Sequence, residues 1–234
     1  MHNHANFSTI KVTGKGVLKL RPDTTRVSIT LNGRHKDYSE TVRRSTEDSE
    51  KLKDVLEKLG FKRTELKTLN FRVDPRYESY RENDEYKQRL AGYEFYHGMK
   101  LEFLSDSALL GRVLYALATS GLDPEFSLSY TVRDTEGAKN QLLSAAVADA
   151  RAKAEVLCAA AGNTLGDIMH INYSMDEPNF VVRPMAKAML RSDMAANGAA
   201  ESFDMDIEPD NIEVSDTVTL IWRTAAAERT GEIY

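Results

Sequence analysis

The sequence predicts an α+β fold in which three helices cover one face of a mostly antiparallel sheet of about seven strands. Three observations lead to this class. Apolar and polar residues alternate in seven segments, as in strands with one buried face. Three other segments carry apolar residues at helical spacing. These elements follow one another as ββα, ββ, αβ, αβ, β, an order that suits two layers around one core.

Four alternating segments in the first half predict strands. They are residues 7–12, the run with Val27, Ile29 and Leu31, the run with Leu69, Phe71 and Val73, and the run from Tyr93 to Phe103. Pro75 follows the third run and suits an edge strand, because proline cannot donate to the ladder. The charged, tyrosine-bearing segment 76–89 then predicts the long mobile tip of a hairpin.

A helix is predicted between the second and third strands. Asp37 and Glu40 have the capping-box pattern, and Gly60 follows the last helical position. The residues expected on its inner face are Val42, Ser45, Ser49, Leu52, Leu56 and Leu59. The first half of this face is polar, so we expect it either to overhang the core or to meet another subunit.

The second half predicts two further helices and three strands. Asp106 begins a short helix that Gly121 closes, and the alanine-rich run 145–161 forms a longer helix before Gly162. The small-residue face of the longer helix is expected to hold Ala146, Ala150, Ala154, Leu157 and Ala161. The remaining strands are expected at 126–132, 168–173 and 212–222.

These elements are expected to form a single domain over residues 7–224. Within it, segment 175–210 is a long Met-rich connection that also contains three prolines. A connection of this length in a compact domain is either functional or mobile.

The composition is typical of a soluble globular protein, with 41% hydrophobic and 29% charged residues. A net charge of −5 argues against a general nucleic-acid binder. No uncharged run approaches the roughly 20 residues of a transmembrane helix. The start of the chain lacks the apolar core of a signal peptide, so the sequence as given predicts a cytoplasmic protein, or a periplasmic or exported one if a leader has been removed. Cys158 is the only cysteine and is expected to be a small buried or half-buried hydrophobic residue.

Short motifs over about nine tenths of the chain carry a resemblance to a known family. They are residues 10–16 with 21–23, Leu59-Gly60 with 66–68, 90–93, 145–166, 207–209, 212–214 and 217–218. In these motifs the chain resembles the SIMPL-domain family, which includes YggE-like proteins. The resemblance implies a single-domain α+β protein of a kind that is often exported and is linked in bacteria to protection from oxidative stress. One relative, a periplasmic immunogenic protein, assembles into a ring-like oligomer. The family has no established catalytic residues, so none are carried over.

The sequence contains no nucleophile–base set, phosphate-binding loop or metal-ligand spacing. We therefore expect a non-enzymatic protein without a cofactor, which self-associates and serves as a protective or scaffolding module. The expected contact surfaces are the polar face of the first helix, the Met-rich connection and the hairpin tip at 76–89, which also suits a protein partner.

An alternative function is small-molecule or soft-metal binding by the Met-rich segment 175–205, with Met185, Met189 and Met194 as the candidate ligands of Cu(I). The competing interpretation is that these methionines fill an irregular apolar contact or a subunit interface. His97 is expected to be a buried histidine with satisfied hydrogen bonds. The carboxylates Glu78, Glu82, Asp84 and Glu85 are expected to be solvated at the hairpin tip.

Overall fold

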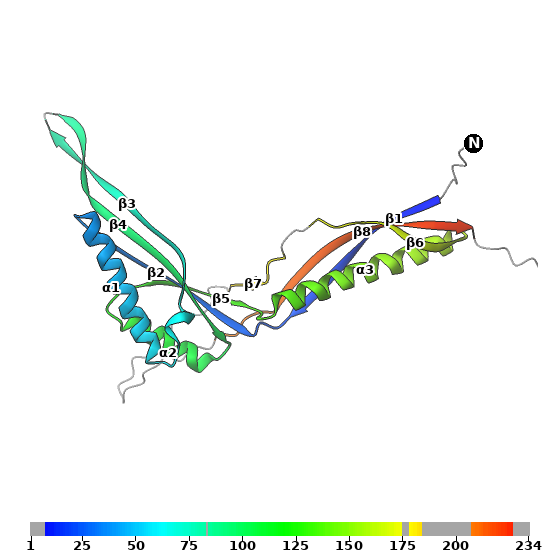
Figure 1. The fold of residues 1–234 in the computed structure, drawn as a ribbon, viewed down its shortest axis with the longest axis horizontal. Coiled ribbons are helices and arrows are strands. Elements are labelled where there is room, and N and C mark those ends of the chain that lie inside the picture. The colour runs from blue at the N-terminus through cyan, green and yellow to red at the C-terminus, as the bar shows by residue number, and fades with distance from the viewer. Residues whose placement is uncertain (1–7, 83, 175–177, 184–206, 227–234) are drawn as a thin grey trace, which may run out of the picture. The chain divides into compact units, whose positions relative to one another are not determined.

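The chain folds into two compact units, each with its own sheet (Figure 1). The computed structural model describes residues 8–82, 84–174, 178–183 and 207–226. Unit 1 comprises residues 1–21, 132–180 and 211–234, and unit 2 comprises residues 22–131 and 181–210. The α+β class is confirmed: the described residues form eight strands in antiparallel pairs and three α-helices.

The division of the strands differs from the single sheet that we expected. A three-stranded sheet has the order β1-β8-β6, and a five-stranded sheet has the order β3-β4-β2-β5-β7. Alternation shows which face of a strand is buried, but it does not identify the neighbouring strand. The expectation of one domain over residues 7–224 stays a prediction, because two compact units can still unfold together.

Unit 1 is a sheet covered by one long helix. Its elements are β1 (Ser8–Leu20), α3 (Thr135–Ala160), β6 (Asn163–Asn172) and β8 (Ile212–Ala226). The core between them contains Val12, Ala146, Ala150, Ala154, Val218, Leu220 and Trp222. Strand β1 continues well past the expected end at residue 12. The added part contains two glycines, Gly14 and Gly16.

Gly14 and Gly16 bring the backbone of β1 against the backbone of α3. A Cβ atom on Gly14 would lie 2.0 Å from the carbonyl oxygen of Ala146, and one on Gly16 would lie 2.2 Å from that of Leu142. Only glycine allows this approach, so the alanine face of α3 and the glycines of β1 fit together. The amide of Lys15, between the two glycines, donates to Asp149 Oδ2 at 2.7 Å.

Helix α3 begins ten residues before the alanine-rich run that predicted it. The side chain of Asp134 caps it by accepting a hydrogen bond from the Gly137 amide at 2.8 Å. Of the expected inner face, the first three alanines are buried, but Leu157 is 52% exposed and Cys158 is buried in its place. A step of four residues advances by more than one helical turn, so the buried line winds around the helix over a twisted sheet.

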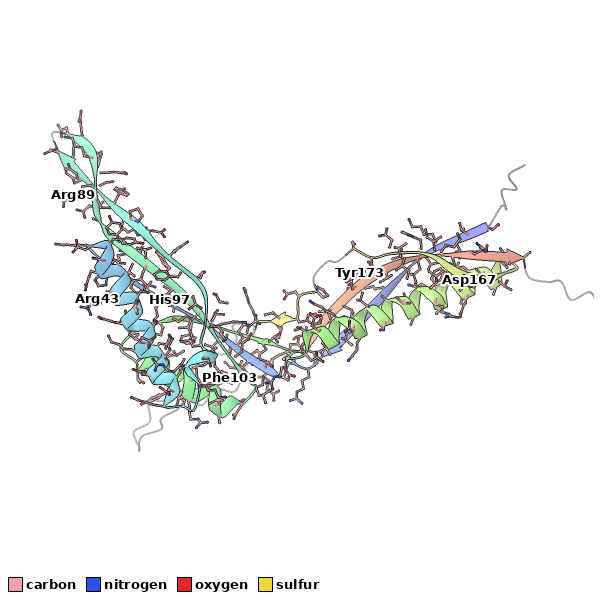
Figure 2. All side chains as sticks on the ribbon, viewed as in Figure 1. Arg43, Arg89, His97, Phe103, Asp167 and Tyr173 are labelled. Atoms are coloured by element: carbon pink, nitrogen blue, oxygen red, sulfur yellow. The ribbon has the colours of Figure 1, made fainter. Side chains whose placement is uncertain are left out.

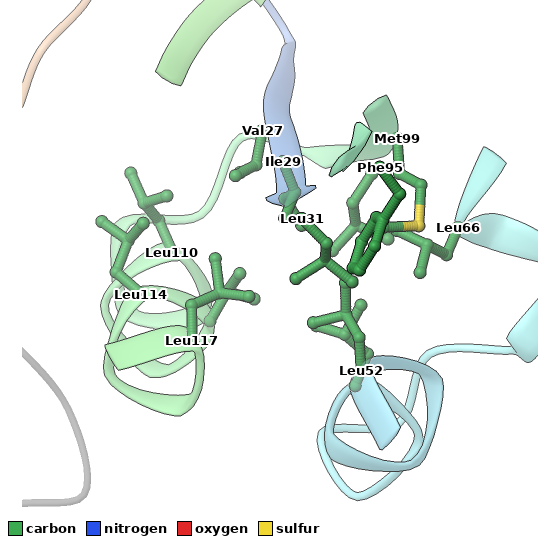
Figure 3. Close-up of a cluster of buried hydrophobic side chains, with 13 residues drawn as sticks. Val27, Ile29, Leu31, Leu52, Leu66, Phe95, Met99, Leu110, Leu114 and Leu117 are labelled. Carbon is green, nitrogen blue, oxygen red and sulfur yellow. The ribbon is translucent and has the colours of Figure 1, made fainter. Parts of the chain in front are cut away.

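Unit 2 packs two helices on the same face of its sheet. Its elements are β2 (Thr24–His35), α1 (Tyr38–Glu57), a 3₁₀ turn (Arg63–Glu65), β3 (Lys67–Glu82), β4 (Glu85–Leu104), α2 (Ser107–Ala118), β5 (Glu125–Thr131) and β7 (Val181–Val182). Figure 3 shows Leu52 of α1 and the leucines of α2 directed at the apolar face of β2 and β4. The short strand β7 lies in the connection for which we expected no strand, and it pairs with β5.

The first helix differs from its prediction in two ways. Asp37 occupies the N-cap position, but its side chain makes no capping hydrogen bond, and Glu40 pairs with Arg43 and Arg44 instead. The polar first half of its inner face is buried against the sheet, so it does not overhang the core. Thr41 and Ser45 are 0% and 1% exposed, and the Thr41 hydroxyl donates to the carbonyl of Asp37 at 2.8 Å.

Candidate functional site

Two features of unit 2 stand out as candidate sites: a two-stranded arm, and a charged pocket at its base. We define the arm as residues 77–90, where β3 and β4 continue past the end of β2. The pairing runs from Tyr77 with Leu90 to Glu82 with Glu85. Figure 1 shows the arm extending beyond α1 and β2, and Figure 2 labels Arg89 on it. The predicted hairpin is confirmed, but most of segment 76–89, which was expected to be its long tip, is paired strand.

The described residues of the arm include exposed apolar side chains, and the two strands bury little apolar surface between them. Tyr77, Tyr86 and Leu90 are 62%, 81% and 48% exposed. Strand β3 ends the sheet order, so no described strand pairs with its outer edge. A two-stranded hairpin alone is marginally stable in water. An exposed edge of this kind is a template for contact with another chain.

The carboxylates of the arm are solvated, as expected, and paired with its cations. Glu78 lies 2.5 Å from Arg89, and Glu82 and Asp84 lie 2.7 Å from Lys87 and Arg81. No carboxyl in these pairs has the desolvated surroundings of a general acid. The carboxyls of these pairs therefore lack the surroundings that acid–base chemistry requires.

A buried carboxylate, Glu94, lies at the base of the arm on the face of the sheet opposite the two helices. Its side chain is 6% exposed, and Arg34 Nε donates to its Oε1 at 2.7 Å. The guanidinium of Arg76 forms an ion pair with the second oxygen, Oε2, but at an angle that makes no hydrogen bond. Arg34, Glu94 and Arg76 come from β2, β4 and β3, so three neighbouring strands build the cluster.

The two arginines keep Glu94 charged. Burial acts to raise the pKa of Glu94, but its contacts with Arg34, Tyr96 and Arg76 together outweigh burial and hold the pKa below its usual range. Tyr96 also stabilises the cations around it. The guanidinium of Arg72 lies 4.5 Å from the centre of the Tyr96 ring, and Arg76 Nη2 donates to the Tyr96 hydroxyl at 3.4 Å.

An open pocket of about 410 Å³ lies beside this cluster. Its lining comes from the end of β2 and the base of the arm: Arg34, His35, Lys36, Arg76, Tyr77, Glu78, Ala91, Gly92 and Tyr93. Gly92 has φ +144°, and a Cβ there would lie 2.4 Å from the carbonyl oxygen of His35. Glycine thus lets the end of β2 cross close to β4 at the point where the pocket opens.

His97, which is labelled in Figure 2, is half-buried and contacts residues of α1 and β3. Its Nε2 lies 2.9 Å from the Thr68 hydroxyl, and its Nδ1 lies 3.5 Å from that of Ser45. Burial, helped by the charge of Lys53, lowers the pKa of His97. These hydroxyls provide the hydrogen-bond partners that the sequence predicted, but His97 is half-buried rather than buried.

The candidate metal ligands Met185, Met189 and Met194 lie outside the described residues. Among the residues that are described, no three His, Cys, Asp or Glu side chains gather as a metal site would require. Met169 is 50% exposed on β6, whereas Met99 is 1% exposed in the core. Cys158 is a buried free thiol, as predicted.

Sequence reasoning missed the cluster of Arg34, Arg76 and Glu94. In the strand from Tyr93 to Phe103, the alternation identified the apolar face, and it carried no prediction for the opposite face, where Glu94 lies. The sequence did contain one indication of this cluster: each of the three strands carries a charged residue at a position that alternates with its apolar residues. Only the register, which pairs Arg34 with Glu94 and Glu94 with Asp74, brings these positions together.

The family described as "SIMPL: Protein of unknown function (DUF541)" matches residues 10–222. The chain is similar to the 26 kDa periplasmic immunogenic proteins of Brucella melitensis biotype 1 and Brucella abortus strain S19. Each is 26% identical over 188 residues, which cover 80% of this chain and 74% of the relative. In the described part of the chain, no helix has the length and hydropathy to cross a bilayer.

Proposed function

The chain belongs to the SIMPL family, and from this membership and the geometry of the arm we propose that it is a non-enzymatic protein that works by associating with copies of itself. In this function the protein serves as a scaffolding or protective module. The arm, residues 77–90, is the contact surface.

The observation that carries the proposal is the exposure of the arm. A strand pair that buries little apolar surface contributes little to the stability of its own unit. Its tyrosines and its leucine gain most when a second molecule covers them, because tyrosine buries a large apolar area and can still form a hydrogen bond.

The charge of the arm supports a second copy as the occupant. The arm, residues 77–90, contains three basic and four acidic side chains and is close to charge balance, although the whole chain carries a net charge of −5. Like-charged copies repel one another, and a balanced surface is where that repulsion is smallest. In an antiparallel approach, the mixed signs also let arginines of one copy face glutamates of the other.

We propose in addition that the protein works in the periplasm and contributes to protection from oxidative stress. The periplasmic location is supported by the names of the Brucella relatives, and the protective role by the family resemblance. Cell fractionation, together with the survival under peroxide of cells without the protein, tests both. Recovery of the protein in the cytoplasmic fraction and unchanged peroxide survival would contradict them.

Size-exclusion chromatography with light scattering tests the self-association. We expect the measured mass to rise above that of the 26.3 kDa chain as the protein concentration increases. A mass equal to that of one chain at every concentration would contradict the proposed function.

A further inference from the structure

We propose that the pocket at the base of the arm binds a small oxyanion, a phosphate or carboxylate group, between Arg34, Arg76 and Lys36. The site adjoins the self-association surface, with which it shares Tyr77 and Glu78, and its ligand goes beyond the proposed function. The charges that line the pocket, the contacts that hold its arginines and the space open to a ligand all suit such a group.

The lining of the pocket is positively charged in a chain that is acidic overall. Arg34, Lys36 and Arg76 line it, and the acidic side chain among them, Glu78, is already paired with Arg89. A concave surface with one sign of charge raises the local concentration of the opposite ion. The pocket therefore selects anions although the net charge of the whole chain repels them.

Glu94 holds the two arginines in position from behind the pocket. Both arginines contact this carboxylate through Nε. A guanidinium has five N–H donors, so the contacts at Nε, together with the hydrogen bond from Arg76 Nη2 to the Tyr96 hydroxyl, still leave terminal N–H groups available for a ligand. Arginine is suited to carboxylate and phosphate because it presents two donors in one plane. Since Glu94 is buried and charged, the arginines are oriented before the ligand arrives, and less side-chain entropy is lost on binding.

The pocket has room for such a group. Its volume is about 410 Å³, within the usual size of small-ligand sites. Tyr77 and Tyr93 add aromatic surface that can contact the rest of a ligand, and Lys36 lies exposed at the rim.

Titration calorimetry with inorganic phosphate and with succinate, at constant ionic strength in chloride, tests this site on the full chain. We expect saturable binding of at least one of the two probes. The phosphate and succinate arms show whether the site prefers a phosphate or a carboxylate. Loss of one cationic contact should weaken binding by about tenfold or more, so Arg34→Gln and Lys36→Gln should both show this loss.

Arg72→Gln is the matched control. Arg72 lies on β3 like Arg76 and shares its face, but it does not line the pocket, so binding should stay as in the unaltered chain. Lys36→Gln keeps the test decisive if Arg34→Gln does not fold, because Lys36 is exposed at the rim. The proposal is overturned if neither probe binds saturably, or if Arg72→Gln weakens binding as much as Lys36→Gln does.

Discussion

Gly14 and Gly16 illustrate how single residues determine the packing of unit 1. Each lies where a Cβ would collide with the backbone of α3 rather than with a side chain that could rotate away. Relief would require the helix to move as a whole. Packing in protein cores leaves little room for such movement.

Gly14→Ala should therefore destabilise the protein by about 1–3 kcal/mol or more, the cost of overpacking a well-packed core. Urea unfolding followed by the fluorescence of Trp222 measures it, because Trp222 lies in the core of the same unit. Lys15→Ala is the control: Lys15 lies between the two glycines with its side chain exposed, so the change should be within about 0.5 kcal/mol. Equal stability of the two variants would show that the close approach is unimportant.

The lowered pKa of His97 predicts that the free energy of unfolding depends on pH. Its pKa is lowered in the folded state, so the unfolded chain takes up a proton at a higher pH than the folded chain does. The stability that neutral His97 contributes to the folded state is fully present above the pKa of histidine in the unfolded chain, about 6.5. It is lost as the pH falls from there through the lowered pKa.

Chemical denaturation between neutral and mildly acidic pH should show this loss, and His97→Gln should reduce it. His170→Gln, at an exposed position on β6, should leave the pH dependence as it is. If His97→Gln and the unaltered chain lose stability in parallel on acidification, burial of His97 does not cause the effect.

At the scale of elements, the arm and the strands that continue from it should differ in local stability. Beyond the bulge at Arg76 and Tyr77, β3 and β4 pair only with each other. Within the sheet, β4 pairs on both sides and is covered by α1. Strands with few buried contacts open locally at low cost.

Hydrogen exchange measured by mass spectrometry should find the amides of residues 77–90 exchanging much faster than those of residues 93–104 in dilute protein. At high concentration the arm should become protected if it lies between copies. Residues 93–104 provide the internal control, because their protection should not change with concentration. Equal protection of both stretches in dilute protein would contradict the description of the arm.

The elements themselves were largely predictable, because their signals are local. Asp106 caps α2 by accepting hydrogen bonds from the amides of Ala108 and Leu109, and Pro75 lies on an edge strand, both as expected. The early start of α3 at Thr135 was missed, because the polar sequence before the alanines has no strong periodicity. The buried polar face of α1 was also misjudged, since hydroxyls can be buried once they find partners.

At the scale of the whole molecule, the sequence could not reveal that β1 pairs with β8. The two strands are separated by nearly the entire chain, and their pairing register runs from Ser8 with Thr224 to Leu20 with Ile212. Pairing at such a separation depends on tertiary packing rather than on local pattern. The Glu94 cluster was hidden for the same reason.

The expected single domain predicts that the two units unfold together. Unit 1 consists of three sequence segments joined through unit 2. Unfolding unit 2 therefore lengthens the loops that unit 1 must close, at an entropic cost. Leu52→Ala, in the core of unit 2, should cost about 2–5 kcal/mol and should lower the unfolding midpoint reported by Trp222 in unit 1.

Far-UV circular dichroism provides the second probe, and coincident transitions indicate one cooperative domain. Lys51→Ala, an exposed neighbour on α1, should leave both midpoints in place. A Trp222 transition that Leu52→Ala does not shift would show that the units unfold independently.

The central claim is that copies of the chain associate through the arm, and sedimentation velocity tests it most directly. Tyr86→Ser with Leu90→Ser removes exposed apolar surface from the arm without touching the pocket lining, and Val156→Ser with Leu157→Ser removes it from the exposed face of α3. We predict that the arm variant sediments as a single chain at concentrations where the unaltered protein and the α3 variant form larger species. Assembly of the arm variant to the same size as the unaltered protein would contradict the claim.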